Sequence, residues 1–126
     1  MTAGMTVLTV DDDEDVRTLV AEVLGRAGFR VLTAASGEAA LDLLESEEPI
    51  DVLFTDVVMS GLSGMELARR GKRLRPSLRV LVASGYWPYI VTGLGADARL
   101  SKPYDATALV SSVRRLFADD ARLPTG

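Results

Sequence analysis

The stretch that decides the fold is VLTVDDDEDVR, residues 7–17. It opens with Val7 to Val10, a short and largely apolar run bounded by charge, which is typical of a strand buried on both faces. Five consecutive acidic residues, Asp11 to Asp15, follow without a break. Carboxylates that crowd together repel one another unless a cation compensates them. The end of this strand is therefore the first candidate for a functional site.

Strand and helix patterns alternate along the rest of the chain. Apolar residues recur at helical spacing from Val16 to Ala27, and Gly28 ends that helix. Serines at 36 and 63 are suited to capping the next two helices, and Pro76 limits the second of them. Further strands are expected at residues 30–34, 50–55, 80–83 and around Leu100, with a last helix after Pro103 that carries an apolar face as far as Phe117. Five such units predict an α/β fold, with one parallel sheet and helices on both faces.

Composition limits the possible functions. The chain has 126 residues, which suits one domain over 1–126, with a core at about 5–118 and a frayed tail at 119–126. Cysteine and histidine are absent, which excludes disulfides, thiolate ligands and imidazole chemistry. No apolar run approaches the ~20 residues of a membrane span, and the N-terminus lacks a secretory signal, so we expect a cytoplasmic protein with no membrane partner.

The charge is local rather than general. Of the 18 acidic residues, five lie at Asp11 to Asp15, and the others nearly balance the 14 basic residues. This balance gives no reason to expect a nucleic-acid partner. For Asp13, Glu14 and Asp15, the favourable interaction of acidic side chains with a helix N-terminus is a sufficient explanation.

Polar groups follow several strands at the point where each strand ends. Ligands of such sheets bind beyond the carboxyl ends of the strands, so these groups are expected to share one pocket. Oxygen ligands without histidine or cysteine favour Mg²⁺, with Mn²⁺ as an alternative. A divalent cation beside a nucleophilic carboxylate indicates phosphoryl transfer to an aspartate, which gives an acyl phosphate. The groups are Asp11 and Asp12 after the first strand, Asp56 after the third, Ser84 after the fourth and Lys102 after the fifth.

This ordered set resembles the receiver domain of two-component response regulators over nearly the whole chain. The acidic pair matches Asp11 and Asp12, the phospho-accepting aspartate matches Asp56, the switch hydroxyl matches Ser84, and the lysine–proline pair, which the family usually holds cis, matches Lys102 and Pro103. The resemblance implies a doubly wound, flavodoxin-like sheet of strand order 2-1-3-4-5.

The resemblance also implies a mechanism. Asp12 and Asp56 would bind Mg²⁺ directly with the carbonyl of Val58, while Asp11 would act through water. A histidine kinase or histidine phosphotransfer protein would donate the phosphoryl group to Asp56. The change would then reach an unidentified downstream protein, and the chain would be a monomer or a weak homodimer. Whether it stands alone or is part of a hybrid kinase is left open.

Three features depart from the family's pattern. Ser60 occupies a position that is usually proline, and Arg99 stands where an aromatic switch residue is usual. Lys102 follows Ser84 by only 18 positions, about one helical turn fewer than usual. A helix within residues 85–98 is therefore expected to be short or irregular, as in a subclass of small receivers. The expected output surface comprises Tyr86, Trp87, Tyr89, Arg99 and Tyr104, although the first three suit a cover for the core equally well.

Two other functions compete with this interpretation. The first is a small magnesium-dependent phosphatase of the haloacid dehalogenase type, with Asp11 as nucleophile and Asp13 as acid and base. It would leave Asp56 without a purpose, and the chain has little room for a substrate-covering domain. The second is a receiver-like binding module that is never phosphorylated. A flavodoxin-like cofactor binder is disfavoured because the acidic run would repel a cofactor phosphate.

Overall fold

Five parallel strands form the centre of the protein. The computed structural model describes residues 4–85 and 96–122, and within them the strands lie in the order β2-β1-β3-β4-β5. This confirms the predicted parallel sheet and its strand order. Each predicted strand is present. Most of the observed strand ends differ from the predicted ends by one or two residues. The strands are β1 (Thr6–Val10), β2 (Arg30–Ala34), β3 (Val52–Asp56), β4 (Arg79–Ser84) and β5 (Ala98–Ser101).

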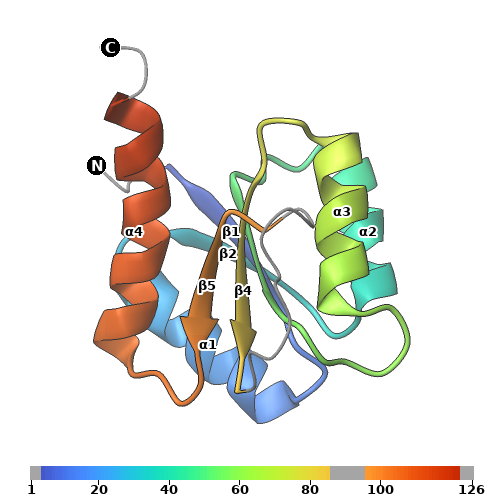
Figure 1. The fold of residues 1–126 in the computed structure, drawn as a ribbon, viewed down its shortest axis with the longest axis horizontal. Coiled ribbons are helices and arrows are strands. Elements are labelled where there is room, and N and C mark those ends of the chain that lie inside the picture. The colour runs from blue at the N-terminus through green and yellow to red at the C-terminus, as the bar shows by residue number, and fades with distance from the viewer. Residues whose placement is uncertain (1–3, 86–95, 123–126) are drawn as a thin grey trace.

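Helices cover both faces of the sheet. Among the described residues, α1 (Glu14–Arg26) and α4 (Ala106–Arg122) lie on one face, and α2 (Gly37–Glu45) and α3 (Gly64–Leu74) lie on the other (Figure 1). The predicted serine caps are confirmed, because Ser36 Oγ accepts from the N–H of Ala39 at 3.0 Å and Ser63 Oγ accepts from Glu66 at 3.2 Å. The short helix expected after β4 falls on residues 86–95, which lie outside the described part of the chain.

The last helix is longer than its apolar pattern indicates. We expected ordered structure to end near residue 118, but α4 continues to Arg122. The apolar face ends at Phe117, and the sequence ADDAR (residues 118–122) follows it. Helical hydrogen bonding can continue past the end of an apolar face, because each added residue contributes one further backbone bond. Among the described residues, no helix is both long and apolar enough to cross a bilayer.

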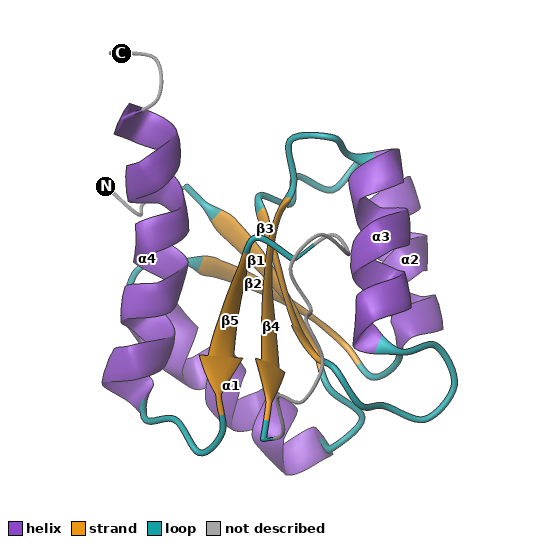
Figure 2. Cartoon of the chain, in the orientation of Figure 1, coloured by secondary structure: helices purple, strands orange, loops and turns teal. Residues whose placement is uncertain are grey.

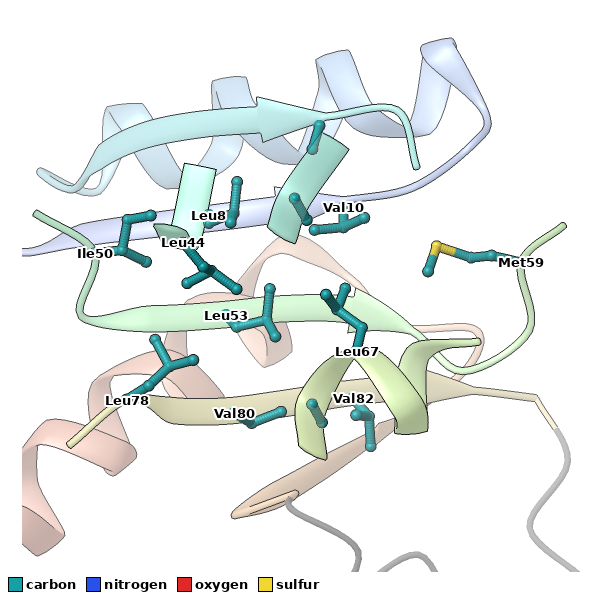
Figure 3. Close-up of a cluster of buried hydrophobic side chains, with 13 residues drawn as sticks. Leu8, Val10, Leu44, Ile50, Leu53, Met59, Leu67, Leu78, Val80 and Val82 are labelled. Atoms are coloured by element: carbon teal, nitrogen blue, oxygen red, sulfur yellow. The ribbon is translucent and has the colours of Figure 1, made fainter. Parts of the chain in front are cut away.

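Side chains of each central strand alternate between two cores. Leu8 and Val10 of β1 join the core under α2 and α3, which Figure 3 shows, whereas Val7 joins the core under α1 and α4. Leu53 of β3 lies in the first core and Phe54 in the second. This period of two explains why β1, β3 and β4 are apolar on both faces. Both cores fix the central strands, so the carboxyl ends of those strands are held in place.

The carboxyl ends of all five strands lie at one edge, because the strands are parallel (Figure 2). The register aligns them: Val10 pairs with Thr55, Asp56 with Ala83, and Ser84 with Ser101. The loops that leave these ends are where the polar residues of the sequence occur. This edge is therefore the place to look for a site.

Candidate functional site

Asp56 and Lys102 are brought together from strands that are not neighbours in the sheet. Lys102 Nζ donates to Asp56 Oδ2 at 2.8 Å, and the two side chains are 37% and 15% exposed. The backbone N–H of Lys102 also donates to the carbonyl oxygen of Ser84 at 2.9 Å, which continues the β4–β5 pairing by one residue. The Lys102–Pro103 peptide bond is cis, as the family resemblance implies. Three of the predicted residues thus meet at one point of the sheet edge.

Asp11 is held in place by the backbone that surrounds it. Its N–H donates to the carbonyl oxygen of Ala34 at 3.3 Å, and its Oδ1 accepts from the N–H of Asp13 at 2.9 Å. Arg17, which the sequence analysis did not single out, donates from Nη1 to the Asp11 carbonyl oxygen at 2.9 Å. These bonds hold the β1–α1 loop over the carboxyl end of β1.

Asp13 has a structural position. Its Oδ1 accepts from the backbone N–H groups of Asp15 at 2.9 Å and Val16 at 3.3 Å, so it is the N-cap of α1. Glu14 and Asp15 follow in the first helical turn, where acidic side chains interact favourably with the helix dipole. The explanation offered for these three acids is therefore confirmed. An acid–base role for Asp13 receives no support, because its carboxylate faces its own helix.

The electrostatics of the edge show that the carboxylates interact. Partial burial raises the pKa of Asp11, and the negative charges of Asp56 and Asp12 raise it further, while the Asp13 N–H and Lys102 oppose the shift. Burial also raises the pKa of Tyr104, again with contributions from Asp11 and Asp56. The negative charge at this edge is thus incompletely compensated by Lys102. A cation at this position would be stabilised.

The oxygen atoms at this edge are of the chemical type that binds a hard divalent cation, although the described carboxylates do not form a compact metal-binding cluster. Within residues 4–85 and 96–122, no group of three acidic side chains has the spacing of a metal-binding cluster. We expected the three carboxylates to share one pocket. Instead Asp56 is drawn to Lys102, and Asp12 Oδ2 accepts from the N–H and the hydroxyl of Ser60, both at 3.3 Å. Carboxylate and carbonyl oxygens are nevertheless the ligands that Mg²⁺ prefers.

The loop after Asp56 is packed closely against the acceptor strand. Gly64 begins α3 and donates its N–H to the Val57 carbonyl oxygen at 2.9 Å. A Cβ atom on Gly64 would lie 1.9 Å from the Asp56 carbonyl oxygen, so only glycine fits there. Met59 is buried and lies 3.9 Å from Thr55 Oγ1, measured to its sulfur. In the sequence SGLSG (residues 60–64), the glycine at position 64 is the sole indication that α3 approaches the Asp56 backbone so closely.

The remaining predicted residues are distributed around the edge. Ser84 is buried at the end of β4, and Val58 is 76% exposed in the β3–α3 loop. Tyr104 is half-buried and packs edge-on against Phe54, with ring centroids 6.0 Å apart. Arg99 is exposed on β5, in register with Val82. Tyr86, Trp87 and Tyr89 lie outside the described residues.

A groove separates α1 from α4 and begins at the site. We call it the α1–α4 groove; its volume is about 610 Å³, and its sides come from α1 and from the chain between Lys102 and Leu109. Its surface is mainly apolar, and Leu19 of α1 is 60% exposed beside it. The groove is lined by Val16, Leu19, Val20, Val23, Lys102, Pro103, Tyr104, Asp105, Ala106 and Leu109.

The fold and the site together define a flavodoxin-like α/β domain whose acidic edge suits a divalent cation in chemistry. The chain belongs to the response regulator receiver domain family, whose model matches residues 7–114. It is therefore a phosphorylation-activated signalling switch of two-component systems, and receiver domains as a family are signalling modules and not metabolic enzymes.

Individual relatives agree with this assignment. The chain is 32% identical to the response regulator receiver protein CpdR of Brucella abortus over 115 residues, which cover 88% of this chain and 95% of CpdR. It is also 32% identical to the transcriptional regulator NtrC of Rhizobium meliloti over 97% of this chain, but spans only 26% of that longer protein. A receiver domain structure from Clostridium thermocellum matches with a TM-score of 0.85 and 28% identity, over 94% of this chain and 98% of the other.

Proposed function

We propose that Asp56 is the residue that accepts the phosphoryl group. The observation that carries this proposal is the 2.8 Å contact between Lys102 Nζ and Asp56 Oδ2, at the edge where Asp11 and Asp12 also lie. The contact holds the Asp56 carboxylate at this edge, where one of its oxygens can act as the nucleophile. Asp56 also ends a strand that is buried in both cores, so its position is fixed before the donor arrives.

The donor in this proposal is a phosphohistidine of a histidine kinase or a histidine phosphotransfer protein. The bond between phosphorus and the donor's imidazole nitrogen breaks, and a bond forms between phosphorus and a carboxylate oxygen of Asp56. The donor histidine keeps the electron pair of the broken bond and takes up a proton from solvent. The product is an acyl phosphate on this chain and a neutral histidine on the donor.

Asp11, Asp12, Asp56 and the carbonyl of Val58 are the groups that would hold Mg²⁺, and Mn²⁺ suits the same oxygens. When bound, the cation supplies positive charge to the phosphoryl oxygens. Lys102 exchanges its contact with Asp56 for contacts with those oxygens. Pro103 fixes the backbone that carries the lysine. The buried hydroxyl of Ser84, at the end of the adjacent strand, binds another of them.

The α1–α4 groove is where a helix of the donor protein docks in this proposal. The groove starts at Lys102 and Pro103, so a helix that lies in it reaches the acceptor without crossing another element. Its apolar lining and the exposed Leu19 match the apolar face of an amphipathic helix. The surface that then signals to a downstream protein includes Arg99 and Tyr104, which lie on β5 and just after it.

Intact mass spectrometry tests the acceptor. Wild-type protein is incubated with Mg²⁺ and a small acyl-phosphate donor, in parallel with Asp56→Asn and Asp11→Asn. We expect one added phosphoryl group on the wild type, its loss in Asp56→Asn, and a slower reaction in Asp11→Asn and after chelation of Mg²⁺. A label that survives Asp56→Asn but disappears in Asp11→Asn contradicts the proposal and supports the phosphatase alternative. A wild-type protein that accepts a phosphoryl group from neither this donor nor a histidine kinase supports a binding module.

A further inference from the structure

Ser60 makes a contact that links two loops across the candidate metal site. Its backbone N–H and its hydroxyl both donate to Asp12 Oδ2 at 3.3 Å, although the two residues are 48 positions apart. Both donors converge on the same carboxylate oxygen. The contact therefore fixes the rotation of the Asp12 carboxylate more strictly than a single hydrogen bond would.

The loop that carries Ser60 is anchored on both sides of it. Met59 is buried, and Thr55 Oγ1 lies 3.9 Å from its sulfur. On the other side, Gly61 has a φ of 78°, in the left-handed region that favours glycine. Beyond it, Gly64 is tied to the Val57 carbonyl. Ser60 is therefore held over Asp12 by its neighbours and does not reach it by chance from a free loop.

The residue at position 60 determines whether the contact exists. Proline, which the family resemblance leads one to expect there, has neither a backbone N–H nor a hydroxyl. Serine supplies both. A carboxylate that ligates a metal is commonly oriented by donors bound to its other oxygen, and loss of such donors weakens metal binding. Because both Ser60 donors bind Oδ2, Oδ1 is the Asp12 oxygen that would ligate a cation.

We propose that Ser60 is a positioning residue for the divalent cation, which holds the Asp12 carboxylate in its metal-binding orientation through two hydrogen bonds to Oδ2. This inference rests on the proposed function, since it takes Asp12 as a ligand. It assigns to this chain a feature of the β3–α3 loop that a proline in the same place does not provide. The cation itself is not required for the contact, because the contact is made by protein groups alone.

Isothermal titration calorimetry with Mg²⁺, without any phosphoryl donor, tests the inference. We expect Ser60→Ala, which keeps the N–H and loses the hydroxyl, to weaken Mg²⁺ binding by roughly threefold to tenfold. Ser60→Thr, which keeps a hydroxyl at this position, is expected to bind Mg²⁺ with an affinity close to that of the wild type. Ser60→Pro removes both donors and is expected to weaken binding more than Ser60→Ala. Ser111→Ala, at an exposed serine of α4, is the matched control and is expected to have no effect.

Three results would overturn the inference. Equal affinity in wild type and Ser60→Ala means that the contact does not orient Asp12, and tighter binding in Ser60→Ala means that Ser60 competes with the cation. If Ser60→Thr binds Mg²⁺ as weakly as Ser60→Ala does, the cause is a general disturbance of the loop. Thermal unfolding without Mg²⁺ would also reveal that disturbance. Equal Mg²⁺ affinity in Asp12→Asn and the wild type removes Asp12 as a ligand and overturns the inference as well. The proposed function fails separately, when Asp56→Asn still takes up the phosphoryl group.

Discussion

Replacement of Gly64 by alanine, which adds a single methyl group, is expected to destabilise the protein strongly. The added Cβ would lie 1.9 Å from the Asp56 carbonyl oxygen and 2.9 Å from both the Asp56 carbonyl carbon and the Val57 Cα. All three are backbone atoms, so no change of rotamer can relieve the overlap. Either the start of α3 or the end of β3 must move by more than an ångström.

The size of the effect follows from what has to move. Overpacking of a well-packed site typically costs 1–3 kcal/mol, and the upper end applies because both partners are backbone, so we expect a loss of about 3 kcal/mol in the free energy of unfolding. With a urea m value of about 2 kcal/mol/M, the unfolding midpoint falls by about 1.5 M. Because Asp56 moves with its carbonyl group, phosphorylation by a small acyl phosphate is expected to slow at urea concentrations where the variant is still folded.

Two other glycines provide matched controls for the same substitution. A Cβ at Gly71, in the same helix, would lie 3.1 Å from a methyl group of Leu78, which can shift. The gain in helix propensity of up to about 1 kcal/mol then nearly balances the contact. A Cβ at Gly25 of α1 meets nothing within 4 Å, so Gly25→Ala is expected to stabilise by about 0.5–1 kcal/mol. If Gly64→Ala unfolds at the same urea concentration as the wild type, the close packing of α3 on the acceptor strand is refuted.

Two further predictions concern charge and docking. The pKa of Asp11 is raised in the folded protein, so its ionisation opposes folding. In the presence of a chelator, the Asp11→Asn variant should therefore become more stable relative to the wild type as the pH rises through and above the normal carboxyl range. Thermal unfolding of both proteins between pH 3 and pH 7 measures this difference in stability. A difference that stays constant with pH contradicts the prediction. Leu19→Glu should slow phosphotransfer from a histidine kinase roughly tenfold or more, the loss typical of an interface hot spot, and leave phosphorylation by a small acyl phosphate unchanged. Leu74→Glu, at an exposed leucine of α3, is the control, and equal effects of both changes contradict docking in the α1–α4 groove.

Local patterns were sufficient to predict the strands and their parallel arrangement, whereas the strand order came from the family resemblance. The apolar runs at β1, β3 and β4 are continuous because those strands are covered on both faces, and the serines that cap α2 and α3 act within one turn of themselves. The predicted start of β3 at Ile50 was two residues early, since β3 begins at Val52. Asp51, just before it, contacts Thr6 both through its side chain, which accepts the Thr6 N–H at 2.8 Å, and through its own N–H, which donates to the Thr6 carbonyl oxygen at 2.9 Å.

The contents of the site were predictable only in part. Residues that directly follow a strand, such as Asp11 and Lys102, can be placed from the strand pattern alone, because parallel strands end at one edge. The contact between Ser60 and Asp12 cannot be placed in this way, since it depends on the path of a loop. The same is true of the approach of Gly64 to Asp56, which has no periodicity to reveal it.

The structure also explains why this site can hold more negative charge than the sheet edge would otherwise tolerate. The five residues of β1 are all buried, so the strand that delivers Asp11 and Asp12 is fixed by apolar contacts in two cores and not by the charges themselves. Partial burial, and after it the negative charges of Asp56 and Asp12, raise the pKa of Asp11 at the end of this strand. The stability of the core therefore offsets a locally unfavourable charge distribution, and such a distribution would attract a divalent cation. In this chain the buried strand β1 therefore supplies the rigid support, and Asp11 and Asp12 after it supply the negative charge.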